Sequence, residues 1–237
     1  QYTTTAKLQA TLDFGFQNAA LGFAQGKATT GLRDMYAGDD WYTDADSNAY
    51  QLPTFLGNHD MGRLAMMLRT SGVSKEDTLT RLKLANSLLY LTRGQPVVYY
   101  GDEQGFEGSG GDKAARQDMF ASKVASYNSE EVIGGASGSK DRYNTNAPLY
   151  RQIADLAKLR AKHPALADGA QIERYASSDA GIFAVSRIDK AANREYLVVT
   201  NNATTAKTAT FATYTPGGRF TPLLGGGGDE RADRFGR

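Results

Sequence analysis

The sequence predicts an α/β fold with parallel strands over residues 1–164, followed by a small antiparallel all-β domain over residues 165–237 that is expected to be incomplete. Two observations carry this prediction. Up to about residue 164, short apolar runs alternate with segments of helical periodicity, which is typical of parallel sheets. Beyond about residue 170, short alternating runs follow one another with no helical segment between them, which indicates antiparallel strands.

The first predicted unit is a strand at about 11–16 followed by a helix that closes at Gly26. The strand prediction rests on apolar residues that alternate with polar or small ones, and a glycine is a suitable helix end. Residues 26–50, rich in glycine, aspartate and tyrosine, are predicted to form a loop. This loop contains Trp41, the only tryptophan of the chain.

The second predicted unit begins with a buried strand at 52–57. A helix is expected after Asp60, where apolar residues recur at helical spacing, and a longer helix runs from Ser74, a good N-cap, to Arg93. A third strand covers residues 97–100, a continuous apolar and aromatic run. Such a run suits a strand that is covered on both faces, as in a parallel sheet.

The remaining chain is predicted to form a long loop, a helix and an antiparallel sheet. Residues 101–145 are glycine-rich, and a loop of this length in a compact domain is usually functional or mobile. A helix is expected from Pro148 to near His163. The four strands expected after it lie at 171–175, 181–188, 195–200 and 206–213.

The composition excludes several classes of function. The formal net charge is +1 without a long basic run, so neither nucleic acid nor an anionic membrane is indicated as a partner. No apolar run approaches the roughly 18 residues that a membrane helix needs. Cysteine is absent, which excludes disulfides, thiolate nucleophiles and cysteine zinc sites.

Polar side chains follow two of the predicted strands. Asn58, His59 and Asp60 come directly after the strand at 52–57, and His59 is one of two histidines in the chain. Glu103 follows the strand at 97–100. If these strands are parallel neighbours, both groups lie at the same edge of the sheet, where parallel α/β folds place their chemistry. A polar turn at 58–60 and a solvated loop acid at 103 are the simpler alternatives.

The same residues resemble a known family. Residues 55–60 read FLGNHD and are similar to the F-x-x-N-H-D block of the alpha-amylase family, glycoside hydrolase family 13. Residues 94–103 read GQPVVYYGDE and are similar to its G-x-P-x-x-Y-x-G-x-E block. Arg116 and Met119 resemble the R-x-x-M step of its last barrel loop. The order and the separation of the blocks also fit this family.

The resemblance implies a fold and a set of site residues. Residues 1–164 would form the last three β/α units of a (β/α)8 TIM barrel, and the upstream half of the same barrel would be their partner. Asp60 would be the third catalytic carboxylate, which stabilises an oxocarbenium-like transition state. His59 would contact the same sugar. Asn58 and Arg63 are further candidate substrate contacts, although Asn58 would chiefly orient the turn and Arg63 would pair with a carboxylate.

Further substrate contacts are expected from Glu103, on the same edge as Asp60, and from Trp41. The loop before the strand at 52–57 carries Trp41, whose ring could stack on a sugar; packing beneath the loop is the alternative. The implied substrate is a starch-like α-glucan, cleaved at α-1,4 bonds with retention.

The sequence also departs from the family. A retaining glycosidase needs a nucleophile and an acid/base carboxyl about 5–5.5 Å apart, and the family blocks that carry them are missing from this chain. The chain begins at Gln1 without a methionine, so we expect it to be an excerpt of a longer polypeptide that is inactive by itself; a processed mature chain is the alternative.

Other readings stay open at this point. Glucan transfer, or action on cyclodextrins, is the enzymatic alternative, and a non-catalytic carbohydrate-binding or scaffold protein is the other. No cofactor is evident: Asp44, Asp46 and Asn48 resemble the start of a calcium loop, but the rest of that motif fails. The resemblance allows calcium in the parent protein, and it suggests an extracellular or periplasmic location.

Overall fold

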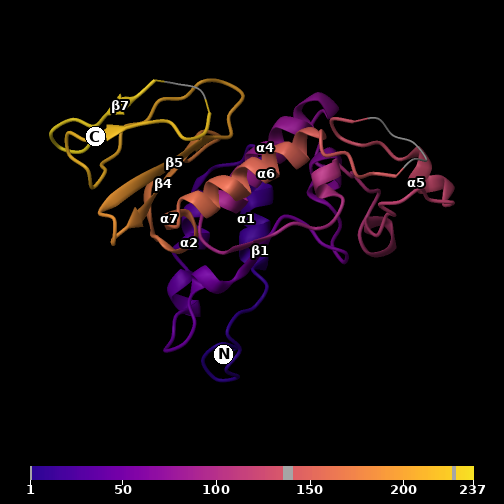
Figure 1. The fold of residues 1–237 in the computed structure, drawn as a ribbon, viewed down its shortest axis with the longest axis horizontal. Coiled ribbons are helices and arrows are strands. Elements are labelled where there is room, and N and C mark those ends of the chain that lie inside the picture. The colour runs from indigo at the N-terminus through magenta and orange to yellow at the C-terminus, as the bar shows by residue number, and fades with distance from the viewer. Residues whose placement is uncertain (1, 136–140, 226–227) are drawn as a thin grey trace.

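The computed structural model describes residues 2–135, 141–225 and 228–237. Helices α4 (Lys75–Leu91) and α6 (Pro148–Lys162) lie in the middle of the molecule (Figure 1). The antiparallel strands β4 (Ile182–Asp189) and β5 (Arg194–Asn201) lie towards one end of its long axis, and the segment around α5 (Ala125–Ser129) lies towards the other (Figure 1).

The prediction of a first strand at 11–16 is wrong, because helix α1 (Phe14–Ala24) begins within that segment. Asp13 is the N-cap, and its Oδ1 accepts a hydrogen bond from Phe16 N at 2.8 Å. The chain still runs beside the next strand at this point, since Asp13 N donates to Pro53 O at 3.0 Å. An apolar alternation of three residues fits either structure, and the aspartate cap favours the helix.

The loop predicted at 26–50 is only partly irregular. It contains helix α2 (Thr30–Tyr36) and the 3-10 helices η1 (Asp39–Tyr42) and η2 (Ala49–Gln51). These elements are short and depend on tertiary contacts rather than on a periodic apolar face, which explains why the sequence pattern missed them.

The parallel pair at the centre is confirmed. Strand β1 (Pro53–Phe55) pairs in parallel with β2 (Gln95–Val97), with Phe55 opposite Val97. Helices α3 (Leu64–Thr70) and α4 (Lys75–Leu91) form the crossover between them. Strand β2 starts two residues earlier than predicted, and Val97 is 46% exposed, so this strand is not covered on both faces.

The segment 101–145 is a long connection, as predicted, although residues 136–140 lie outside the described part. The helices between β2 and the antiparallel sheet are η3 (Asp102–Gln104), η4 (Asp112–Ala115), α5 (Ala125–Ser129), α6 (Pro148–Lys162) and α7 (Ala165–Asp168). Helix α6 confirms the helix that was predicted to begin at Pro148, whereas α7 was not predicted.

Antiparallel strands follow, in the order β3-β4-β5. They are β3 (Ala170–Ala176), β4 (Ile182–Asp189) and β5 (Arg194–Asn201), close to three of the predicted strands. The fourth prediction, at 206–213, is wrong, because that segment forms no strand. Two short strands, β6 (Arg219–Phe220) and β7 (Glu230–Arg231), pair with each other instead.

The helices and the antiparallel sheet share one apolar core. Its buried members include Phe23 from α1, Leu89 from α4, Leu156 from α6 and Phe183 from β4. Asn202, which follows β5, donates through Nδ2 to Phe23 O and Lys27 O at 2.9 and 2.8 Å. Among the described residues, no helix combines the length and the apolar content required to cross a membrane.

Candidate active site

Asp60 lies on a tight turn that follows the carboxyl end of β1. Asn58 and Gly62 close this turn through reciprocal backbone hydrogen bonds of 3.1 Å. Inside it, Asn58 Oδ1 accepts from Asp60 N at 2.9 Å and from Met61 N at 3.0 Å. The turn therefore fixes the Asp60 backbone while its side chain stays 74% exposed.

Two nitrogen-bearing side chains stand beside the Asp60 carboxylate. His59 Nε2 lies 3.3 Å from Asp60 Oδ1, and the Arg116 guanidinium lies 3.8 Å from the same oxygen. Arg116 also pairs with Asp112 at 2.9 Å. An exposed carboxylate held among hydrogen-bond donors can stabilise positive charge that develops on a bound molecule.

A second loop packs directly on the Asp60 turn. Asp112 N donates to Asp60 O at 3.0 Å. A side chain at Gly111 would collide with the Asp60 carbonyl, so glycine permits this close approach. The position of Asp60 thus depends on the loop that contains η4 as well as on its own turn.

Arg63 was predicted as a substrate contact, and the structure corrects this prediction. Its side chain is fully buried at the N-cap position of α3. The guanidinium donates to Tyr100 O at 2.8 Å and to Asp102 Oδ1 at 2.7 Å. It also donates to Ala115 O at 3.1 Å and to Gln117 Oε1 at 2.9 Å. The predicted pairing with a carboxylate is present, and no surface of Arg63 is left for a sugar.

Glu103 lies beyond the end of β2, at the same sheet edge as Asp60, as the parallel pairing requires. Its Oε2 accepts from Gly101 N at 2.8 Å, so the carboxylate closes its own turn. The neighbouring Asp102 pairs with Arg63. Burial raises the pKa of Asp102 to about 6, although the Arg63 charge and hydrogen bond act in the opposite direction.

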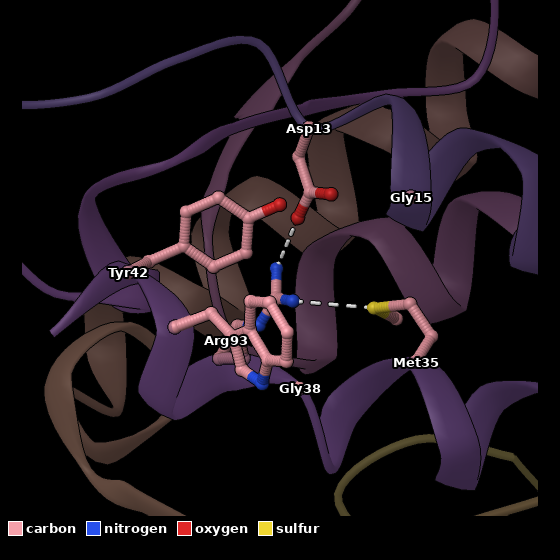
Figure 2. Close-up of a pocket in the computed structure, with 7 residues that line it drawn as sticks. Asp13, Gly15, Met35, Gly38, Tyr42 and Arg93 are labelled. Atoms are coloured by element: carbon pink, nitrogen blue, oxygen red, sulfur yellow. Dashed lines mark hydrogen bonds and ion pairs between the residues drawn. The ribbon is translucent and has the colours of Figure 1, made fainter. Parts of the chain in front are cut away.

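Trp41 lies at the amino edge of the strands, opposite to the edge that carries Asp60. It is 86% exposed and lines a pocket of about 260 Å³ together with Tyr42, Asp13 and Arg93. Figure 2 shows the Arg93 guanidinium between the Asp13 carboxylate and the Met35 sulfur. Arg93 precedes β2, whereas Asp60 follows β1. A loop that leads into a parallel strand reaches its amino end, not its carboxyl end.

A sequence profile described as "Alpha amylase, catalytic domain" matches residues 1–169, more than half of the chain. The chain belongs to the alpha-amylase family, glycoside hydrolase family 13. This membership confirms the resemblance seen in the blocks at 55–60 and 94–103.

Relatives in the family include hydrolases and transferases by name. An alpha-amylase of Streptomyces lividans is 49% identical over 228 residues, which cover 94% of this chain and 25% of the relative. A cyclomaltodextrin glucanotransferase of Niallia circulans is 27% identical over 222 residues, covering 91% of this chain and 25% of the relative. The chain thus spans about a quarter of the length of these relatives.

Solved alpha-amylases share the fold. An Anoxybacillus alpha-amylase superposes with a TM-score of 0.73 at 23% identity, covering 96% of this chain and 45% of that one. An alpha-amylase from Geobacillus thermoleovorans, solved as a complex with acarbose, gives a TM-score of 0.71 at 18% identity, covering 97% and 45%. These superpositions show that this chain has part of the alpha-amylase fold.

Sequence reasoning in terms of the family missed two neighbours of Asp60. Arg116 was recognised as part of a family motif but received no role in the site, and Asp112 was not considered. The available signal was the glycine pair at 110–111 just before charged residues, in a loop that follows a strand end. Glycine in such a place often marks a close approach of two backbone segments.

Proposed function

We propose that the protein containing this chain is a retaining glycoside hydrolase that cleaves α-1,4-glucosidic bonds in starch-like α-glucans. The observation that carries the proposal is the Asp60 turn, which presents an exposed carboxylate between His59 and Arg116 in a member of the alpha-amylase family. The name of the Streptomyces lividans relative supports hydrolysis.

In this proposal Asp60 acts in the transition state. Cleavage of the glycosidic bond develops an oxocarbenium-like charge on the sugar, and a fixed carboxylate beside it lowers the barrier. His59, which is exposed next to Asp60, would donate to a hydroxyl of the same sugar. Glu103 stands at the same edge, but its carboxylate accepts from Gly101 N. The backbone of the turn that it closes, rather than the carboxylate, would therefore contact the substrate.

The nucleophile and the acid/base carboxyl would come from an upstream part of the protein. Residues 1–164 would form the C-terminal part of a (β/α)8 barrel, with β1 and β2 as two of its strands, and residues 165–237 would form the small domain after it. The coverage of about a quarter of each curated relative supports the presence of further segments in the complete protein. The two upstream carboxyls would lie about 5–5.5 Å apart, as retention requires.

The test is Asp60→Asn in the complete protein, assayed on a soluble α-glucan. Asparagine keeps the shape of the side chain and removes its charge, so kcat is expected to fall about 1,000-fold with little change in thermal stability. Asp34→Asn is the matched control, because Asp34 is also an exposed carboxylate paired with an arginine, at 2.8 Å. Full activity in Asp60→Asn would refute the proposed role.

Transglycosylation is the second candidate, since cyclomaltodextrin glucanotransferases are among the relatives. Analysis of products in the presence of a sugar acceptor decides between them: free reducing ends support hydrolysis, and transfer products support the alternative. Binding of α-glucan without any turnover would favour a carbohydrate-binding protein.

Calcium in the complete protein and an extracellular location stay predictions. Among the described residues, no cluster of histidine, aspartate or glutamate side chains could hold a metal ion.

A further inference from the structure

Arg63 joins the two loops that frame the Asp60 turn. From the N-cap of α3 it reaches Tyr100 O and Asp102 in the loop after β2. It also reaches Ala115 O and Gln117 in the loop that packs on Asp60. Resting on the proposed function, we propose that Arg63 is a positioning residue that holds the η4 loop, and through it Asp60 and Arg116, in the geometry that the reaction needs.

The connection from Arg63 to Asp60 is short. Arg63 Nη2 holds Ala115 O, and the next residue is Arg116, which lies 3.8 Å from the Asp60 carboxylate. Three residues before Ala115, Asp112 N is hydrogen-bonded to Asp60 O. Because Tyr99 Oη also donates to Ala115 O, at 3.0 Å, this carbonyl is held from two sides. A shift of Ala115 therefore moves both Arg116 and Asp112, the two partners of Asp60 in this loop.

Aromatic rings hold the guanidinium in place. Its carbon lies 4.6 Å from the centroid of Tyr99, 5.1 Å from Phe106 and 5.4 Å from Tyr100. A planar guanidinium can stack on rings and donate in its plane at the same time, and the compact ammonium of lysine cannot. Arg63→Lys therefore keeps the charge and loses the geometry.

Asp102 makes the arrangement sensitive to pH. Among the described residues, the charged groups that act on it are Arg63 and the adjacent Glu103, and no charged side chain of α6, which packs on η3, contributes. The pKa of about 6 means that Asp102 is ionised at neutral pH and protonated in mild acid. Only the ionised form of Asp102 places an opposite charge against Arg63, so only that form adds an ion pair to the hydrogen bond.

The first experiment compares Arg63→Lys with Arg160→Lys in the complete protein. Arg160 is the matched control, because it is also a buried arginine with several backbone acceptors, among them Tyr90 O and Gly94 O, near the amino end of β2. Both variants are expected to lose thermal stability. The kinetic constants are measured at a temperature below the midpoint of unfolding of both variants. There, only Arg63→Lys is expected to lower kcat, by about 10- to 100-fold, with a much smaller change in KM.

Equal kcat values for the two variants, measured where both are folded, would overturn the proposal. If Arg63→Lys does not fold, Asp102→Asn provides the decisive readout. The ratio of wild-type to Asp102→Asn kcat is expected to be roughly five- to tenfold above about pH 7. It is expected to approach one below about pH 5, because wild-type Asp102 is then protonated.

A ratio that does not change with pH would overturn the proposal, because a purely structural loss would not follow the protonation of Asp102. Both of these outcomes require an active wild-type protein. If the wild-type protein is itself inactive on α-glucans, the result refutes the proposed glycosidase function and, with it, the reaction for which Arg63 positions Asp60.

Discussion

Gly62 shows how much of the site depends on one backbone position. Its φ is +96°, and a Cβ there would lie 2.9 Å from Gly110 O and 2.6 Å from Met66 Cε. Gly62 both closes the Asp60 turn and permits contact with the loop that packs on it. The same residue therefore fixes the turn and the distance between the turn and its neighbour.

Gly62→Ala is expected to destabilise the protein by about 2–4 kcal/mol, from a left-handed alanine and from overpacking. Gly72→Ala is the matched control, since Gly72 has φ +93° and open space around its Cβ position. It carries only the backbone cost, about 1–2 kcal/mol. Unfolding in denaturant measures both values, and equal losses would mean that the close approach at Gly62 contributes nothing.

At the scale of single residues, the sequence located the site but not the neighbours of each side chain. The turn residue Asn58 was predicted from its local chemistry, and its hydrogen bonds within the turn follow that prediction. The burial of Arg63 could not be predicted, because its acceptors lie 37 to 54 residues further along the chain. For Trp41 the sequence predicted a place in the loop before the strand at 52–57 but no edge of the sheet.

Among the elements, the sequence predicted the limits of the helices α4 and α6 closely, and for the start of α4 the signals are local. Ser74 Oγ accepts from Asp77 N at 3.0 Å and donates to Asp77 Oδ2 at 2.9 Å. This reciprocal pair satisfies a backbone donor that the first turn of a helix otherwise leaves free. The segment at 206–213 is the opposite case, since an alternating pattern cannot form a strand without a partner strand.

Ser74→Ala is expected to lower the free energy of unfolding by about 1 kcal/mol, because it removes the N-cap acceptor. Ser74→Thr keeps a hydroxyl at the same place and should lose only a small part of that. Urea denaturation of the two variants, with the slope unchanged, measures the difference. Identical midpoints for alanine and threonine would show that the cap does not contribute to stability.

The whole molecule is held together where the antiparallel sheet meets the helices. Asn202 is 1% exposed there: its Oδ1 accepts from Gly181 N at 2.7 Å, and its Nδ2 donates to Phe23 O and Lys27 O. The sequence predicted the α/β part, the antiparallel sheet and a boundary between them near 164–170. It did not predict the contact that Asn202 makes between the two. A single asparagine 179 residues from its acceptor leaves no local signal.

Asn202→Ala tests whether the two architectures unfold together. The substitution removes the side-chain partner of the buried Gly181 N on the sheet side and of Lys27 O on the helix side, which is expected to cost about 3 kcal/mol. Asn201→Ala is the matched control, because within the described residues the Asn201 side chain bonds only to nearby backbone, at Thr205 O and Ala203 N. Its expected cost is about 1 kcal/mol or less.

The readout is denaturant unfolding followed by pulsed amide hydrogen exchange, measured separately in peptides from α4 and from β4. Because Phe23, Leu89 and Phe183 belong to one core, the two signals are expected to change at the same midpoint in the wild-type chain. In Asn202→Ala both midpoints should fall together. Separate midpoints in the wild-type chain would mean that the sheet folds independently of the helices, and equal losses in Asn201→Ala and Asn202→Ala would mean that Asn202 does not couple them.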